Sequence, residues 1–375
     1  MQNSGSDKRI YFLDNLRSFI VLLVVGFHAS MAYMPNAPWW WYVLDSQRNP
    51  FFDSFVLIND VFMMPTMFFI AGYFAVKSLT RRGTTHFVRD KIIRLIIPWI
   101  IGVIFFAPAV TYFIYITRSA SPPPYLYYWV HLFFGESYQQ AHYWFLGILA
   151  LFCLLLALFY RQGWLTLTLL KAAKPSNTFL AGFVLLGSAG FFAVNMFVND
   201  YAWVNVKYLF IIQPTRVVLY VMYFVLGIYA CRRQWFISGG YCPRSFNWVA
   251  SAIITGSLFI GSKLVLAKNT AVWVMAANAF LHTLFCFCAV FSLLGIFQRW
   301  GNSRSYLWRR LSANSYAIYF VHQFPVFSLN YVLLNYSAGP FIKFMLSASL
   351  SVLISYTVCE LMVGRISIFT GRKRQ

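Results

Sequence analysis

The sequence predicts an all-α membrane protein that crosses the bilayer about ten times and forms a single domain over residues 1–375. Hydrophobic residues make up 60% of the chain and charged residues only 10%, whereas roughly a quarter of the residues in a soluble domain are charged. The apolar runs are about as long as the roughly 20 residues that a spanning helix needs. The alternating ten-residue strands typical of a membrane β-barrel are not found in the sequence.

Ten apolar runs are predicted to form the spanning helices, because a helix satisfies its own backbone hydrogen bonds within lipid. No internal repeat relates the runs, although such repeats are typical of many transporter folds. The predicted spans lie near residues 11–34, 54–79, 92–116, 143–160, 178–198, 208–230, 247–267, 272–298, 312–334 and 341–363.

The positive charges predict the orientation. Most Lys and Arg residues precede the first run, separate the second from the third, occupy every second loop thereafter or follow the last run. Cytoplasmic loops carry this excess, so we expect both termini in the cytoplasm and a multi-pass protein of the cell (inner) membrane. The net charge of +21 reflects this anchoring, and nucleic-acid binding is not expected. The opposite loops hold only Arg48, Arg118, Lys207, Lys263 and Lys268.

The start of the chain and its cysteines make further predictions. The first run is too long for the apolar region of a cleavable signal peptide, so we expect an uncleaved signal anchor. The six cysteines are scattered, without the spacing of a disulfide framework or a metal site. We therefore expect them to pack as small hydrophobic residues, and we expect no bound cofactor.

The first predicted helix carries Asp14, Arg17 and His28. An ionisable residue at membrane depth usually marks a function or a structural pair. At about 100° per residue the three side chains fall within a sector of about 60°, and His28 lies roughly 21 Å along the axis from Asp14. Asp14 and Arg17 form either an i,i+3 ion pair or part of a site. A partner that orients His28 must come from another helix, and Asp60 has a compatible depth.

A second basic group enters the third predicted helix from the cytoplasmic side. It consists of Arg89, Lys91 and Arg94. Ordinary cytoplasmic anchoring explains part of this group, but Arg94 adjoins an apolar run. Such a cationic cluster suits a phosphorylated cytoplasmic ligand.

The longest external loops cover residues 35–53 and 117–142. The first contains Trp39, Trp40 and Trp41, which suit either an interfacial aromatic belt or a lid over an acceptor site. The second begins with a stiff run of three prolines and continues with an amphipathic piece, residues 127–134, that is predicted to lie on the surface.

Six motifs follow one another along the chain: Leu13-Asp14-x-x-Arg17 followed by His28, Phe68–Phe74, Arg89-x-Lys91-x-x-Arg94-x-x-x-Pro98, His142–Leu146, Ser315–Pro325, and Glu360 after Tyr356. Over residues 11 to about 360 they resemble the acyltransferase 3 family of membrane acyltransferases. Within that family, the Tyr-Phe-Leu-Asp opening and the Gly-Tyr-Phe element are most similar to the branch that succinylates osmoregulated periplasmic glucans. The family usually has an arginine where this chain has Lys91, and lysine keeps the charge but loses bidentate phosphate geometry.

The resemblance implies transfer of a short acyl group, acetyl or succinyl, from cytoplasmic acyl-CoA to a hydroxyl of an exported or periplasmic carbohydrate such as a glucan. His28 would act as general base or form an acyl-histidine, and His142 would bind the acceptor or position His28. Asp60, chosen for its depth, is the expected orienting partner of His28. Asp14 and Glu360 would be structural ion-pair partners. The acyl donor would be bound by Arg17, Arg89, Lys91 and Arg94, with Arg216 and His322 lining its tunnel or forming interhelical hydrogen bonds.

Two other classes compete with an enzyme. Intramembrane Asp, Arg and His residues also build the proton relays of transporters, and a partner in export would need no chemistry. The cations gather at the cytoplasmic end of the predicted bundle. This asymmetry favours the enzyme over a proton-coupled transporter or a non-enzymatic export partner. The oligomeric state stays open.

Overall fold

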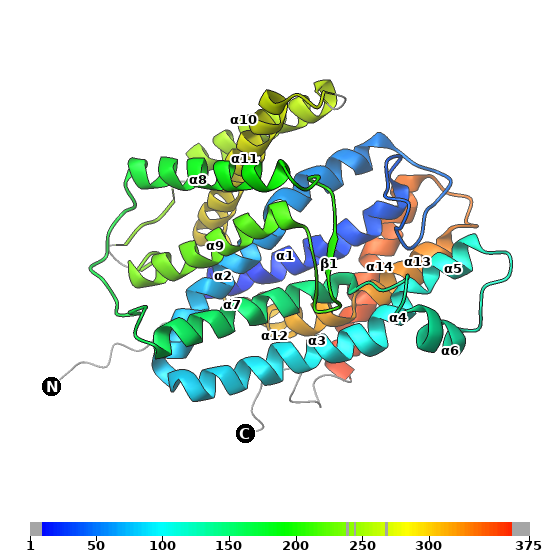
Figure 1. The fold of residues 1–375 in the computed structure, drawn as a ribbon, viewed down its shortest axis with the longest axis horizontal. Helices are drawn as coiled ribbons and strands as arrows, with labels where there is room; N and C mark the ends of the chain where they lie inside the picture. Colours follow the sequence, from blue (N-terminus) through cyan, green and yellow to red (C-terminus); the bar gives the residue numbers. More distant parts are fainter. Residues whose placement is uncertain (1–9, 238–239, 244, 267–268, 362–375) are drawn as a thin grey trace.

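The computed structural model describes residues 10–237, 240–243, 245–266 and 269–361. Most of the long helices run along the longest axis of the molecule and form one bundle (Figure 1). The described residues also contain a two-stranded antiparallel sheet, β1 (Val204–Val206) with β2 (Phe210–Ile212). The described part of the chain is therefore all-α apart from this short hairpin.

The helices have the following bounds in chain order. The first part of the chain forms α1 (Tyr11–Ser30), η1 (Met31–Tyr33), α2 (Pro50–Lys91), η2 (Ile92–Ile96), α3 (Ile97–Ile101), η3 (Gly102–Phe106), α4 (Ala107–Thr111), α5 (Phe113–Arg118), α6 (Tyr125–Tyr127), η4 (Tyr128–Leu132) and η5 (Ala141–Tyr143). The remainder forms α7 (Trp144–Arg161), α8 (Asn177–Asn195), α9 (Pro214–Arg232), α10 (Ser245–Val265), α11 (Val272–Arg299), α12 (Tyr306–Val321), α13 (Gln323–Leu333) and α14 (Pro340–Leu361).

Eight helical segments within the described residues are long and apolar enough to cross a membrane. This confirms the predicted class, an all-α multi-pass membrane protein. The segments are Tyr11–Tyr33, Pro50–Arg118, Ala141–Arg161, Asn177–Asn195, Pro214–Arg232, Phe246–Val265, Val272–Arg299 and Pro340–Leu361.

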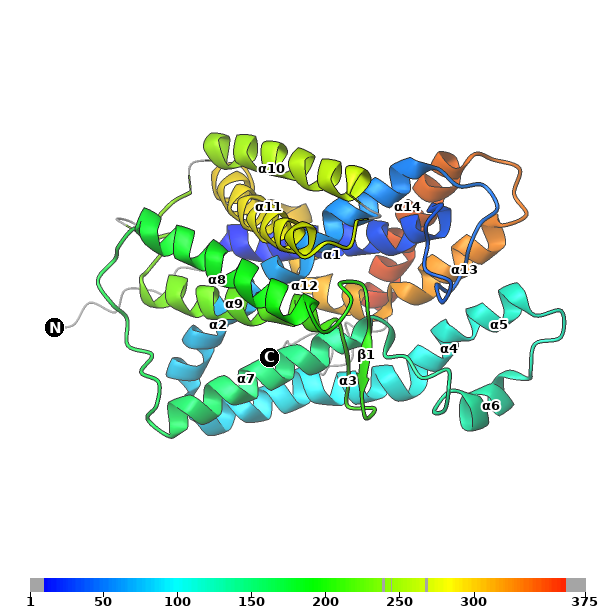
Figure 2. The same ribbon diagram turned by 45° about the horizontal axis from the view of Figure 1, so that its top comes forward.

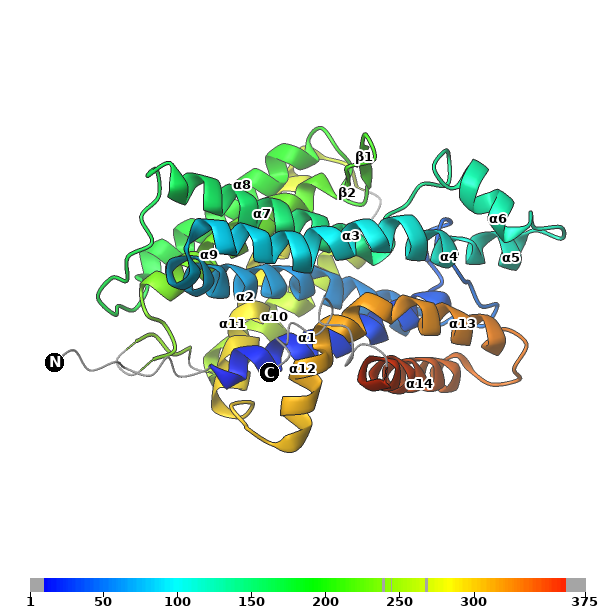
Figure 3. The ribbon, with the colours of Figure 1, turned by 90° about the horizontal axis from the view of Figure 1, so that it is seen from below.

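The segment Pro50–Arg118 contains two of the predicted spans, 54–79 and 92–116, within 69 helical residues. Gly83 interrupts the helix with φ of 74°, a left-handed conformation that glycine adopts without a steric penalty. Beyond Gly83 the chain runs back in the opposite direction through η2, α3, η3 and α4 (Figures 1 and 3). One long helical segment thus folds into a hairpin.

The predicted span 312–334 forms two shorter helices, α12 and α13, which meet at His322. Pro325 has no N–H to donate to the carbonyl of Val321, so the helical ladder is interrupted at this point. The break places the side chains of His322 and Gln323 at a helix junction in the interior, where both are buried.

The predicted span 208–230 begins too early. Residues 210–212 form β2, and α9 begins only at Pro214. Proline fits the first turn of a helix, where its missing N–H leaves no hydrogen bond unmade. Helices α10 and α11 lie side by side at the top of the bundle in Figure 2.

Helices α2 and α9 approach each other most closely at two glycines. A Cβ atom on Gly72 would lie 2.1 Å from the carbonyl oxygen of Phe224, and one on Gly227 would lie 2.1 Å from that of Phe69. Small residues allow helix backbones to come into contact inside a membrane. Gly72 belongs to the motif Phe68–Phe74, so close helix packing explains why a glycine is needed there.

Replacing Gly72 with alanine is expected to lower the free energy of unfolding by about 1–3 kcal/mol, because the added methyl group forces the two backbones apart. Thermal unfolding in detergent measures this loss. Gly26→Ala in α1 is the matched control, since a Cβ there meets nothing within 4 Å. Equal melting temperatures for the two variants would contradict this account of the contact.

Candidate active site

Three histidines from distant parts of the chain meet near the C-terminal end of α1. His28 Nδ1 lies 2.9 Å from His322 Nε2, and the rings of His142 and His322 have centroids 4.6 Å apart. The rings of His28 and His142 are 6.5 Å apart. His142 and His322 are buried, and His28 is half-buried. His28 therefore has a partner from another helix, and that partner is His322.

The broken helix α12–α13 orients two of these rings. The last carbonyls of a helix have no partner within it, and here histidine side chains occupy two of them. His322 Nδ1 lies 2.6 Å from the Tyr319 oxygen, and His142 Nε2 lies 3.2 Å from the Phe320 oxygen. The Tyr143 hydroxyl also donates to Phe320 O, at 2.8 Å.

Two further side chains enclose His28. The ring of Trp41 stacks on it, with centroids 5.8 Å apart and an interplanar angle of 8°. Gln323 Nε2 lies 3.3 Å from His28 Nε2, and Gln323 Oε1 accepts no hydrogen bond from the described residues. Trp41 was predicted only as part of a belt or lid. Gln323 belongs to the motif Ser315–Pro325, but no role was predicted for it.

The loop that carries Trp41 is fixed at two points. The Arg118 guanidinium donates to the carbonyl oxygens of Trp39 and Trp41. Lys343 Nζ in α14 lies 2.8 Å from Asp45 Oδ2, and both side chains are 1% exposed. This buried ion pair was not predicted, because Asp45 lies in a loop whose contacts the sequence does not reveal.

The opposite end of α1 carries the predicted local pair. Arg17 Nη2 lies 3.4 Å from Asp14 Oδ1, which confirms the i,i+3 ion pair. Arg17 Nη2 also lies 3.5 Å from Ser312 O in α12, while its Nε is buried and unpartnered among the described residues. The same face of α12 reaches the second basic group, because Tyr316 OH donates to Arg94 O at 2.6 Å. Arg17 and Arg94 thus both contact α12.

The second basic group lies at the end of α2 and in η2. Arg89 is exposed, and the Lys91 ammonium lies 5.0 Å from the centroid of the Phe87 ring. Arg94 Nε lies 2.9 Å from Asp90 Oδ1, an i,i+4 pair that offsets part of its charge. No described contact joins Arg89 or Lys91 to Arg17.

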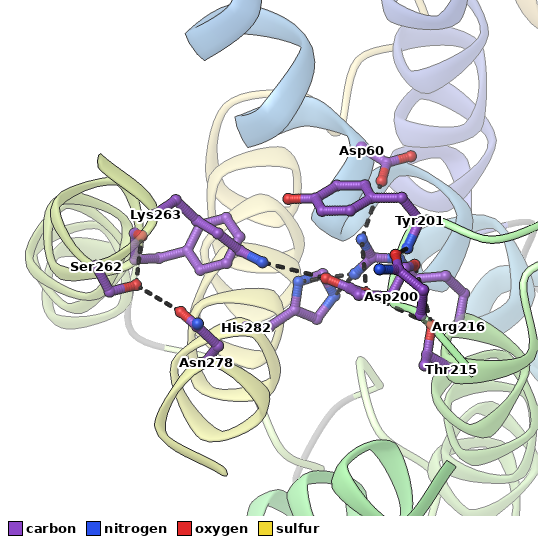
Figure 4. A network of polar contacts seen from close by, with 11 residues as sticks. Asp60, Asp200, Tyr201, Thr215, Arg216, Ser262, Lys263, Asn278 and His282 are labelled. Carbon is purple, nitrogen blue, oxygen red and sulfur yellow. Dashed lines mark hydrogen bonds and ion pairs between the residues drawn. The ribbon is translucent and has the colours of Figure 1, made fainter. Parts of the chain in front are cut away.

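The structure corrects the expected positions of Asp60 and Arg216. Asp60 Oδ2 lies 3.4 Å from Arg216 Nη2, so its described partner is Arg216 and not His28. Arg216 also lies 3.5 Å from Asp200 and 2.8 Å from His282 Nδ1 (Figure 4). No described hydrogen bond or ion pair joins Arg216 to His28 or His322. A guanidinium at membrane depth needs counter-ions. The depth of a residue in the membrane does not determine the rotation of its helix about the helix axis. The sequence therefore did not predict which partners Asp60 and Arg216 would contact.

Lys263 completes this second cluster, with Nζ 3.1 Å from Asp200 Oδ2 (Figure 4). Burial by itself would raise the pKa of the Asp200 carboxyl, but the Arg216 and Lys263 cations outweigh burial and hold the pKa below its usual range. Two cations and two carboxylates therefore balance, and they join α2, α9 and α10 to the loop before β1.

Glu360 has the structural role that was expected. Its carboxylate lies 3.2 Å from Arg310 Nη1 and 2.6 Å from Asn314 Nδ2, both in α12. This pair ties the end of α14 to α12, and it confirms a cation as the partner of Glu360.

A family model described as an acyltransferase domain matches residues 10–360. The chain belongs to the acyltransferase 3 family. Membership implies acyltransferase activity. The motifs that suggested this family converge in the structure, because the first-helix, His142 and Ser315–Pro325 motifs all meet around His28 and His322.

Similarity to individual members of the acyltransferase 3 family is partial. Over 102 residues the chain is 30% identical to glucans biosynthesis protein C of Salmonella typhi and of Salmonella typhimurium, and 29% identical to that of Salmonella schwarzengrund. Each alignment covers 25% of this chain and 24% of the relative. The match thus spans about a quarter of the curated relatives' length. No solved structure matches the chain.

Proposed function

We propose that this acyltransferase moves a short acyl group, acetyl or succinyl, from cytoplasmic acyl-CoA to a hydroxyl of an exported or periplasmic carbohydrate. The observation that carries the proposal is the pairing of His28 with His322 at one end of α1, with Arg17 beside α12 at the other end. A glucan is the favoured acceptor, because the relatives with partial similarity are named glucans biosynthesis protein C.

The proposed topology has ten crossings and cytoplasmic termini. The hairpin at Gly83 divides Pro50–Arg118 into two crossings, and α12 with α13 together form another. The positive-inside rule then directs Arg17 and Arg94 toward the cytoplasm and His28 toward the outer side.

The two ends of α1 would hold the two ends of the donor. Arg17 has an unpartnered buried Nε and is partly exposed, so its guanidinium can bind a phosphate group of CoA. Arg94 and, farther out, Lys91 and Arg89 would add positive charge at the same mouth. His28 lies roughly 16 Å along the helix from Arg17, a separation that the extended arm of CoA would bridge.

The proposed chemistry is a direct transfer. His28 takes the proton from the acceptor hydroxyl as its oxygen attacks the thioester carbonyl carbon. The carbon–sulfur bond breaks, and the proton held by His28 passes to the departing thiolate, so that the products are an ester and free CoA. A covalent acyl-histidine is the variant of this route in which His28 attacks the thioester first.

The test is an assay of purified protein in detergent with acetyl-CoA or succinyl-CoA and a glucan acceptor. We expect release of free thiol with one of the donors, dependent on the acceptor, and a matching mass increase of the glucan. No thiol release from either donor, together with no donor binding by calorimetry, would overturn the proposal. Uptake measurements in proteoliposomes would then test the alternative function, a proton-coupled transporter.

Replacing Asp60 with asparagine is expected to leave turnover in this assay within about threefold of wild type, because Asp60 pairs with Arg216 and not with His28. The loss in the free energy of unfolding should be about 1 kcal/mol, since the Asp60 carboxylate is partly exposed and Arg216 keeps Asp200 as a counter-ion at 3.5 Å. Turnover and melting temperature are measured together. A loss of turnover as large as that of a His28 variant would restore Asp60 to the catalytic site.

A further inference from the structure

The hydrogen bonds of His322 determine which of its nitrogens carries a proton. Its Nδ1 lies 2.6 Å from the carbonyl oxygen of Tyr319, which can only accept, so Nδ1 carries the hydrogen. The side chain is fully buried, and its described contacts are to other aromatic rings and backbone, without a carboxylate. A second proton would place an unpaired charge inside the membrane. His322 is therefore neutral, with a lone pair on Nε2.

This lone pair in turn fixes the proton of His28. His28 Nδ1 lies 2.9 Å from His322 Nε2, so Nδ1 must donate and carries the hydrogen. The other nitrogen of neutral His28, Nε2, is then an acceptor. A separate contact agrees, because the amide nitrogen of Gln323, a donor, lies 3.3 Å from that same Nε2.

We infer that His322 is a positioning residue that holds His28 in the Nδ1-protonated tautomer, so that Nε2 of His28 is the atom that receives the proton of the acceptor hydroxyl. In a histidine the hydrogen bond at one nitrogen sets the state of the other. The inference rests on the proposed function for the role of His28, whereas the tautomer itself follows from the hydrogen bonds. Trp41, stacked on His28, keeps the ring in the required plane.

The hydrogen bonds between His322 and Tyr319 and between His28 and His322 would also act during the reaction. When Nε2 of His28 takes up the hydroxyl proton, the ring becomes a cation that still donates from Nδ1 to His322. A charge-assisted hydrogen bond is stronger than a neutral one, so His322 stabilises the charged form without touching either substrate. The proton then leaves from Nε2 to the thiolate, and both histidines return to their starting tautomers.

The tautomer can be measured without any assay of activity. The chain contains six histidines, so nitrogen-15 labelling of histidine in wild-type protein in lipid bilayers gives few signals. The His28 signal is the one that disappears in His28→Gln. We expect its Nδ1 to be protonated and its Nε2 to be bare. A protonated Nε2 on wild-type His28 would overturn the inference.

Three variants test the positioning role. Because the side-chain carbonyl of glutamine can take the place of Nε2 as an acceptor, His322→Gln should retain at least tenfold more turnover than His322→Leu. His322→Asn is too short to reach His28 and should resemble the leucine variant. For leucine and asparagine we expect turnover to fall by about 10²-fold or more with KM unchanged, since a wrong tautomer alone can cost about 10⁴-fold in a catalytic triad.

The outcomes separate the possible failures. An equal loss in all three variants, or a change in KM alone, would overturn the positioning role. If the variants do not fold, as judged by thermal unfolding, the tautomer of His28 measured in the wild-type protein tests the inference instead. Full transfer by His28→Gln would instead overturn the proposed function, while the tautomer measured on the wild type would still stand.

Discussion

Replacing His28 with glutamine is expected to lower the turnover of acyl transfer by about 10²- to 10⁴-fold, the usual contribution of a general base. Glutamine has a similar length but cannot take up a proton at the position of Nε2. The affinity for the acyl donor should stay unchanged, because the proposed donor site at Arg17 lies at the other end of α1. Turnover is read from thiol release, and donor affinity from calorimetry.

His86→Gln is the matched control for this variant, since His86 is exposed and lies in α2 outside the histidine cluster. It should transfer acyl groups at the wild-type rate. A His28→Gln protein that is folded and retains turnover within threefold would contradict the role of His28. A burst of thiol without acceptor in the wild type would favour the acyl-histidine variant over direct transfer.

Replacing Lys343 with methionine is expected to lower the free energy of unfolding by about 3–5 kcal/mol, because it leaves the buried Asp45 carboxylate without its counter-ion. Lys343 Nζ and Asp45 Oδ2 are 2.8 Å apart, and both residues are 1% exposed. The pair anchors the loop that carries Trp41 over His28. Five of the six cysteines are buried, so a thiol-reactive dye reports thermal unfolding in detergent.

A double variant distinguishes loss of the pair from loss of packing. Lys343→Met with Asp45→Asn removes both charges, and we expect it to recover more than half of the lost stability. Lys174→Met, at an exposed lysine, is the control and should unfold like the wild type. If the double variant is less stable than the single one, the unpaired carboxylate is not the cause of the loss.

The sequence predicted the features that depend on local spacing. The lengths of the apolar runs predicted the helical segments, and the i,i+3 spacing of Asp14 and Arg17 predicted their ion pair. Glu360 was expected to pair with a cation, and Arg310 is that partner. Each of these follows from how residues are spaced along one helix or from the cost of an unpaired charge.

Contacts between helices were harder to predict. Counting residues gives the depth of Asp60 and His28 in the membrane, but not the rotation of one helix relative to the other. His322, at the junction of α12 and α13, lies beside His28, and Trp41 from a loop stacks on the same His28 ring. These contacts join positions distant in sequence, so a single sequence gives little information about them.

The cluster around Arg216 has an electrical consequence. It holds two positive and two negative side chains, with each ion pair within 3.5 Å. A membrane potential of 100 mV does about 2.3 kcal/mol of work on one elementary charge that crosses the whole membrane. Because the opposite charges are held together, the field exerts no net force on the cluster. In a membrane, a change of voltage is therefore expected to leave the position of these four side chains unchanged.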